Sequence, residues 1–302
     1  MKLRKIHCLG GSLLALSFVS SSAVALAPEV SLSAQAGYRS DALDWQSSSA
    51  SQLWNSSWGD LNIYHARLGV DIRFDRIHLR GMFGYGTITD GWSVDDSNRS
   101  GSNASIVGDT TGDVLDTDLA IGYRFHVRSV EHRHTYLMPT IGYSYHEQNL
   151  RDDNGYNRIS GTSISGLDRS YSAEWDGLWF GLNLWETDQS QDFTIAAELA
   201  YYLSDFYAAG DLKGDPNEAD YEHPVSFEQG IGDTTGIRFS LYGNYALSQS
   251  TDLVFGFDYQ TWEAKNGTHR NQLSNGTTED LTLDAVNWES ASMNVGLAYF
   301  FY

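Results

Sequence analysis

A short acidic stretch in the second half of the chain carries the residues best suited to chemistry. The segment EADYEHPVSFEQ, residues 218–229, sets His223 among Glu218, Asp220 and Glu222. A histidine beside carboxylates can act as a general base, because the carboxylate holds the imidazole in one tautomer while the other ring nitrogen accepts a proton. The same histidine can equally be a solvated residue of an acidic loop. Its position in the fold decides between these two interpretations.

A second acidic stretch could face the first. The segment TDGWSVDDSN, residues 89–98, contains Asp90, Asp95 and Asp96. Carboxylates gathered at the mouth of a cleft attract basic peptides or divalent cations, because they concentrate a negative field there. A hydrated loop surface of the same composition would need no function. We expect neither a bound metal nor a cofactor in the protein.

The amino-terminal residues predict export from the cytoplasm. Lys2, Arg4 and Lys5 precede an apolar run, and small residues near Ala25 and Ala27 form a cleavage site, so residues 1–27 are predicted to be a signal peptide. Residues 28–302 are then one mature domain. The net charge of −20 becomes more negative by three when this segment leaves, which argues against nucleic acid as a partner.

Apolar and polar residues alternate with a period of two along most of the mature chain. In NIYHARLGVDIRF every second residue from Tyr64 to Phe74 is apolar, while the residues between them include Arg67 and Asp71. Ten strands are predicted, near residues 30–46, 60–74, 76–96, 113–127, 135–150, 170–187, 191–210, 234–248, 251–264 and 285–302. The small number of prolines, 4, suits a fully paired sheet.

The connections between these strands predict a membrane barrel. Short turns alternate with long loops at residues 47–59, 97–112, 151–169, 211–233 and 265–284. An even number of amphipathic strands with this alternation is typical of a ten-stranded antiparallel transmembrane β-barrel of the outer membrane. The long loops would be extracellular and both termini periplasmic. Positive and negative side chains on the inner face nearly balance, which favours paired charges over an open porin.

Several segments resemble one known family. GTITDGWSVDD, IGYSYHEQNLR, LDRSYSAEWDGLWFGLNL, DYEHPVSFEQ and the terminal GLAYFFY are together similar to the omptins, outer-membrane proteases of Gram-negative bacteria, over essentially the whole mature chain. The resemblance implies cleavage between basic residues, with an Asp-x-Asp pair facing an Asp-x-His pair. It also implies lipopolysaccharide as a possible activating lipid.

The omptin motif is only partly present. Asp95 is followed two residues later by Ser97, and His223 is preceded two residues earlier by Tyr221. We therefore expect an omptin-like surface protein, monomeric, whose acidic extracellular cleft binds basic or cationic partners without established catalysis.

The alternatives are a protease and a channel. In an omptin-type endoprotease, His223 with Asp220 or Glu222 would act opposite Asp95 and Asp90. Glu222, Asp96 and Glu218 are the candidate binding residues. A small-solute channel is the third possibility. Outer-membrane lipid and lipopolysaccharide are the expected lipid partners.

Overall fold

The computed structural model describes residues 28–98, 103–188, 190, 192–216 and 220–301. The predicted signal peptide, Glu218 and Tyr302 lie outside these ranges. Among the described residues no helix is long and apolar enough to cross a membrane.

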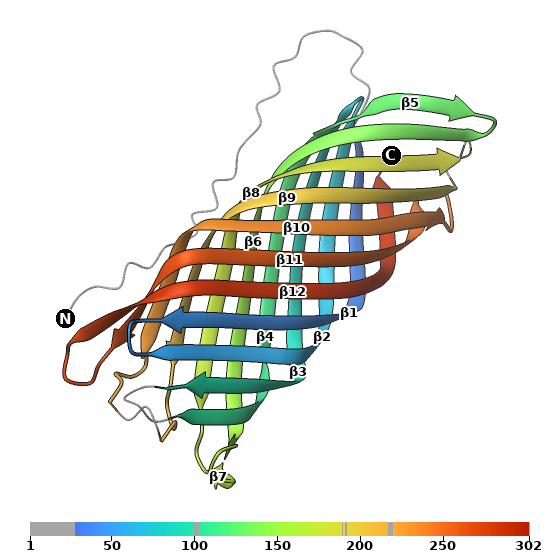
Figure 1. The fold of residues 1–302 in the computed structure, drawn as a ribbon. Helices are drawn as coiled ribbons and strands as arrows, with labels where there is room; N and C mark the ends of the chain where they lie inside the picture. Colours follow the sequence, from blue (N-terminus) through green and yellow to red (C-terminus); the bar gives the residue numbers. More distant parts are fainter. Residues whose placement is uncertain (1–27, 99–102, 189, 191, 217–219, 302) are drawn as a thin grey trace.

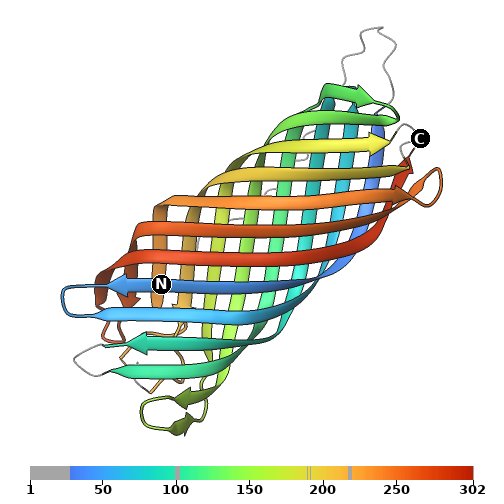
Figure 2. The same ribbon diagram turned by 45° about the vertical axis from the view of Figure 1, so that its right-hand side comes forward.

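The described chain folds into a single antiparallel sheet that closes on itself (Figures 1 and 2). The strands are β1 (Glu29–Ser48), β2 (Leu53–Phe74), β3 (Ile77–Ser97), β4 (Ala104–Tyr123), β5 (Phe125–Val130), β6 (Arg133–Asn157), β7 (Thr162–Ile164), β8 (Arg169–Asp188), β9 (Phe193–Asp211), β10 (Phe227–Ala246), β11 (Thr251–Gln272) and β12 (Thr278–Phe301). β1 pairs with β12, and β4 pairs with β6, so the ring has no open edge along its length. The predicted all-β antiparallel barrel is confirmed.

Two of the strands are additions to this ring. β5 continues the path of β4 after Arg124 and pairs with β6, while β7 pairs only with the end of β6. The ring itself is made of the ten long strands, joined by short connections at the end where β1 begins and β12 ends (Figure 1).

The strands run much further than the sequence predicted. Most of the predicted long loops are strand, because β2 already begins at Leu53 and β10 at Phe227, and β11 continues to Gln272. The connection between β1 and β2 therefore shrinks from the predicted residues 47–59 to residues 49–52. Two features hid the continuing strands: the chemistry of each face changes along the barrel, and β-bulges shift the alternation by one residue, as between Gly59 and Asn62 of β2.

β1 illustrates this change. One row of alternate side chains faces the barrel interior throughout; it begins polar with Ser33, which lines an inner cavity, and ends apolar with the buried Leu43 and Trp45. The opposite row changes in the reverse sense, from the exposed Leu32 to the exposed Asp44. One half of the barrel thus presents apolar groups to lipid and the other half presents polar groups to water.

Exposed aromatic residues mark the limits of the lipid-facing half. Where the outward row turns polar, neighbouring strands carry the exposed tyrosines Tyr38, Tyr64, Tyr85 and Tyr259. At the opposite limit lie the exposed aromatic residues Phe74, Tyr123, Tyr299 and Phe301. Amphipathic aromatic rings concentrate at the two membrane–water interfaces, so these two sets bound the spanning segment.

The half that extends beyond the tyrosines is filled by an aromatic core. Its large members are Trp45, Trp54, Trp58, Trp175, Trp179, Trp262, Trp288, Tyr171, Tyr202, Phe206 and Phe227, all buried. Glycines make room for the rings: a Cβ on Gly142 would lie 2.3 Å from a ring atom of Trp179. Among the described residues, this half is packed with buried rings like the interior of a soluble β-barrel.

Candidate functional site

Three carboxylates converge on one guanidinium at the outer end of the aromatic core. Arg169, the first residue of β8, lies 3.2 Å from Asp95 of β3, 3.1 Å from Asp152 of β6 and 3.6 Å from Asp215. Its side chain is 5% exposed. The group carries a net negative charge, because three acids surround a single cation.

Neighbouring side chains hold these carboxylates in place. The indole N–H of Trp54 donates to Asp95 at 2.6 Å, and that of Trp58 donates to Asp152 at 3.0 Å. Burial raises the pKa of the Asp95 carboxyl to about 7, although Arg169 opposes the shift. Burial also disfavours the charged guanidinium, yet Asp95 and its two acidic neighbours raise the pKa of Arg169 above its usual value.

His223 has an acidic partner of its own. Its Nδ1 is 2.5 Å from Oδ1 of Asp211, the last residue of β9. The His223 side chain is 42% exposed, whereas that of Asp211 is 13% exposed. The arrangement leaves Nε2 as the nitrogen able to exchange a proton with solvent.

Asp211 and most of the Arg169 cluster line one small cleft of about 20 Å³, at the end of the barrel away from the termini. Asp95, Arg169 and Asp211 form its polar part, and its apolar walls include the rings of Trp45 and Phe227. Negative charge beside aromatic faces is the chemistry that binds ammonium and guanidinium groups.

The other predicted residues that the structure describes are not among those lining this cleft. Asp90 is exposed where β3 pairs with Asn62 of β2. Asp96 is exposed, next to Asp95 on the strand. Asp220 and Glu222 are exposed; the Glu222 N–H donates to the carbonyl of Gln272 at the end of β11, and the Asp220 carbonyl accepts from the N–H of Ser274 just after it. The partner expected for His223 was Asp220 or Glu222; in the structure it is Asp211, twelve residues earlier.

Sequence reasoning did not select Arg169, Asp152 or Asp211 as site residues. Arg169 and Asp152 fell in the predicted loop 151–169, and Asp211 was one acid among many. The alternation of inward and outward side chains could have found two of them, because Arg169 and Asp152 lie on the inward-facing rows of β8 and β6. This alternation can be assigned to the two residues only once the strands are known to continue beyond the apolar band.

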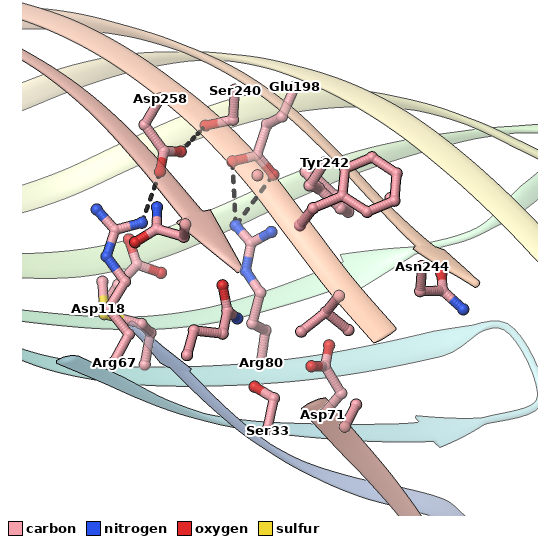
Figure 3. A pocket seen from close by; sticks show the side chains of 18 of the residues that line it. Ser33, Arg67, Asp71, Arg80, Asp118, Glu198, Ser240, Tyr242, Asn244 and Asp258 are labelled. Carbon is pink, nitrogen blue, oxygen red and sulfur yellow. Dashed lines mark hydrogen bonds and ion pairs between the residues drawn. The ribbon is translucent and has the colours of Figure 1, made fainter. Parts of the chain in front are cut away.

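A separate polar cavity occupies the lipid-bounded half of the barrel (Figure 3). Its volume is about 250 Å³. Arg80 and Arg238 both contact Glu198, and Arg67 lies 2.6 Å from Asp258. Most of these charges are paired, whereas Nε of Arg67 and Nε of Arg238 have no hydrogen-bond partner within the described chain and could bond to water in the cavity. Within the described ranges, no group of three or more histidine, cysteine or acidic side chains is arranged to hold a metal ion.

Residues 33–301 match the family model described as Pom, Protochlamydia outer membrane protein. The chain belongs to this family. Membership in the Protochlamydia outer membrane protein family agrees with the closed barrel and its apolar band, and it supports an outer-membrane location. No curated protein matches the sequence.

A solved outer-membrane protease shares the fold of this member of the Protochlamydia outer membrane protein family. The outer membrane protease OmpT from Escherichia coli has a TM-score of 0.71 at 13% identity, covering 91% of this chain and 99% of that one. The translocator domain of the autotransporter NalP from Neisseria meningitidis scores 0.39 at 12% identity, covering 91% and 89%. The outer membrane protein OprG from Pseudomonas aeruginosa scores 0.34 at 9%, covering 91% and 97%. The omptin resemblance is therefore supported for the fold alone.

Proposed function

We propose that this outer-membrane barrel uses its acidic cleft to bind basic segments of peptides or proteins, without established catalysis. The observation that carries the proposal is the cluster around Arg169: the cleft already holds one guanidinium among Asp95, Asp152 and Asp215. Three acids against one cation leave an excess of negative charge beside aromatic walls, in a region shielded from water. The cleft end would face the outside and both termini the periplasm, since the shortest connections lie at the terminus end.

The packing of the barrel makes a channel the weakest of the three expected functions. Trp175, Trp262 and Trp288 meet inside the barrel with ring centroids 5.7 to 6.0 Å apart. Aromatic rings at this spacing are in direct contact, so a solute would have to displace a buried core to pass.

Binding of a fluorescent arginine-rich peptide to the refolded protein, with and without lipopolysaccharide, tests the proposal. Asp211→Asn removes one cleft charge, and Asp44→Asn removes an exposed charge from the outer part of β1 as a matched control. A charge-assisted contact contributes about 1.5 kcal/mol or more, so Asp211→Asn should weaken binding about tenfold. The control should bind like wild type. Equal binding by the two variants, or binding indifferent to salt, would contradict the proposal.

Hydrolysis is the second candidate, and the pairing of His223 with Asp211 favours it. The carboxylate orients the imidazole, the exposed ring edge can take a proton from water, and Asp95 lines the same cleft as Asp211. Cleavage of a quenched dibasic peptide, lost in His223→Ala and in Asp211→Asn, would establish it. Activity no higher than that of a heat-inactivated sample would remove it.

A further inference from the structure

A basic hairpin projects from the end of the barrel opposite the acidic cleft. Pairing between β3 and β4 stops at Ile77 and Tyr123, so β5 pairs with β6 alone in the described chain. Figure 1 shows β5 at the end of the barrel where β12 finishes, with β7 at the far end. All six residues of β5 are exposed.

The charge of this hairpin is opposite to that of the protein. Residues 124–134 contain Arg124, Arg128 and Arg133 with Glu131 as the only acid, in a chain whose net charge is −20. Arg133 lies 2.8 Å from Glu186, and both of these side chains remain exposed. Among the described residues Arg128 takes part in no ion pair.

The outward face of the hairpin prolongs the lipid-facing surface. Tyr123 and Phe125 are exposed with ring centroids 4.8 Å apart, and they lie among the aromatic residues that bound the apolar band. Beyond them Val130 is 42% exposed. Arg128 pairs with Thr135, and Val130 with Arg133, so apolar and basic side chains are interleaved just past the aromatic boundary. Phospholipid headgroups occupy this depth, and long basic side chains reach them while their stems stay in the apolar layer.

The free edge of β5 is poorly suited to pairing with another strand. The strand is only 6 residues long, and its register with β6 shifts between His126 and Arg128. Short edge strands, bulges and basic side chains are the features that prevent edge-to-edge association. A lipid surface therefore fits the hairpin better than a protein strand does.

We propose that the hairpin of residues 124–134 is a binding surface for anionic phospholipid headgroups of the leaflet at the terminus end of the barrel, with Arg128 and Arg133 contacting the phosphate and headgroup oxygens. This surface does not involve the cleft residues. Its function is independent of what the cleft binds, and in the proposed orientation the leaflet is the periplasmic one.

Native mass spectrometry of the mature barrel in detergent tests the proposal. Phosphatidylglycerol and phosphatidylcholine with identical acyl chains are titrated separately, and the ratio of their apparent association constants is measured. Each arginine near an anionic surface contributes about fivefold, so Arg128→Gln with Arg133→Gln should reduce the preference for phosphatidylglycerol by about fivefold to 25-fold. Arg128→Lys with Arg133→Lys, which keeps the charge, should retain it.

The matched control removes the same charge from the opposite end. Arg151→Gln with Arg158→Gln changes two exposed arginines beside the β7 end and should leave the preference within twofold of wild type. The proposal is overturned if the two glutamine pairs behave alike. It is also overturned if the β5–β6 pair alters lipopolysaccharide binding alone, or if the wild type is a dimer that this pair dissociates.

Discussion

Arg169→Ala is the substitution that most directly tests the description of the cleft. It leaves Asp95, Asp152 and Asp215 facing one another without their shared cation, in a place where Asp152 and Asp215 are each 4% exposed. Removing one partner from a buried ion pair costs about 3 to 5 kcal/mol. For a chain of this size we expect the unfolding midpoint to fall by about 6 to 20 °C.

The size of this loss should depend on pH. The pKa of Asp95 is already raised to about 7 with Arg169 in place, and without the guanidinium it should rise further. An acid whose pKa is higher in the folded state binds a proton that the unfolded state lacks, so stability increases as the pH falls through that value. Lowering the pH from 8 to 5 should therefore restore part of the stability lost in Arg169→Ala.

Thermal unfolding of the refolded protein in detergent, followed by circular dichroism, measures both effects. Arg270→Ala is the control, because Arg270 pairs with Asp280 at the surface, where both side chains are about half exposed. Its midpoint should stay near that of wild type. If the two alanine variants lose the same stability at pH 8, or if the loss in Arg169→Ala is unchanged at pH 5, the reasoning about the cluster is wrong.

Three further predictions concern the packed half of the barrel. Burial lowers the pKa of His269 to about 4. Acidification from pH 6.5 towards 4 should therefore lower the unfolding free energy of the wild type by up to about 3 kcal/mol, because the buried imidazole must take up a proton. His269→Gln should not show this loss when the unfolding of the two proteins is measured against pH. Trp45→Ala should lower the unfolding free energy by about 3 to 5 kcal/mol in a denaturant titration, because the Trp45 side chain is only 2% exposed. Trp92 is 40% exposed, so Trp92→Ala should cost much less. Equal losses in the two variants would contradict the assigned core. Planar bilayers containing the protein should show no stepwise conductance, and regular steps would mean that the aromatic core does not close the barrel.

The barrel fold could be predicted from the sequence because lipid imposes a simple rule on it. Every outward side chain between Tyr64 and Phe74 meets hydrocarbon, and every strand must be fully hydrogen-bonded, so alternation and even spacing are visible without knowledge of any partner strand. The same rule placed Asp95 at the outer end of the third strand and His223 near the mouth.

The extent of the strands could not be predicted in the same way. In the lipid-facing half, the outer face of each strand meets lipid and the inner face meets water. Beyond the tyrosines, the outer face meets water and the inner face packs in an aromatic core. Residues such as Trp54 and Trp58 then lie on the face that had been polar, and the segment no longer resembles a membrane strand. In β2 a bulge between Gly59 and Asn62 also shifts the alternation by one residue, so a prediction based on one uninterrupted pattern ends there.

The contacts that form the cleft could be known only from the tertiary structure. The sequence by itself determined that an acidic, all-β barrel carries a histidine and several carboxylates near one end. Only the pairing of the strands decided that Arg169 meets Asp95 and Asp152, and that His223 binds Asp211 instead of Asp220. These contacts join residues far apart in the chain, and a one-residue change in strand register would turn each of those side chains to the opposite face of the sheet.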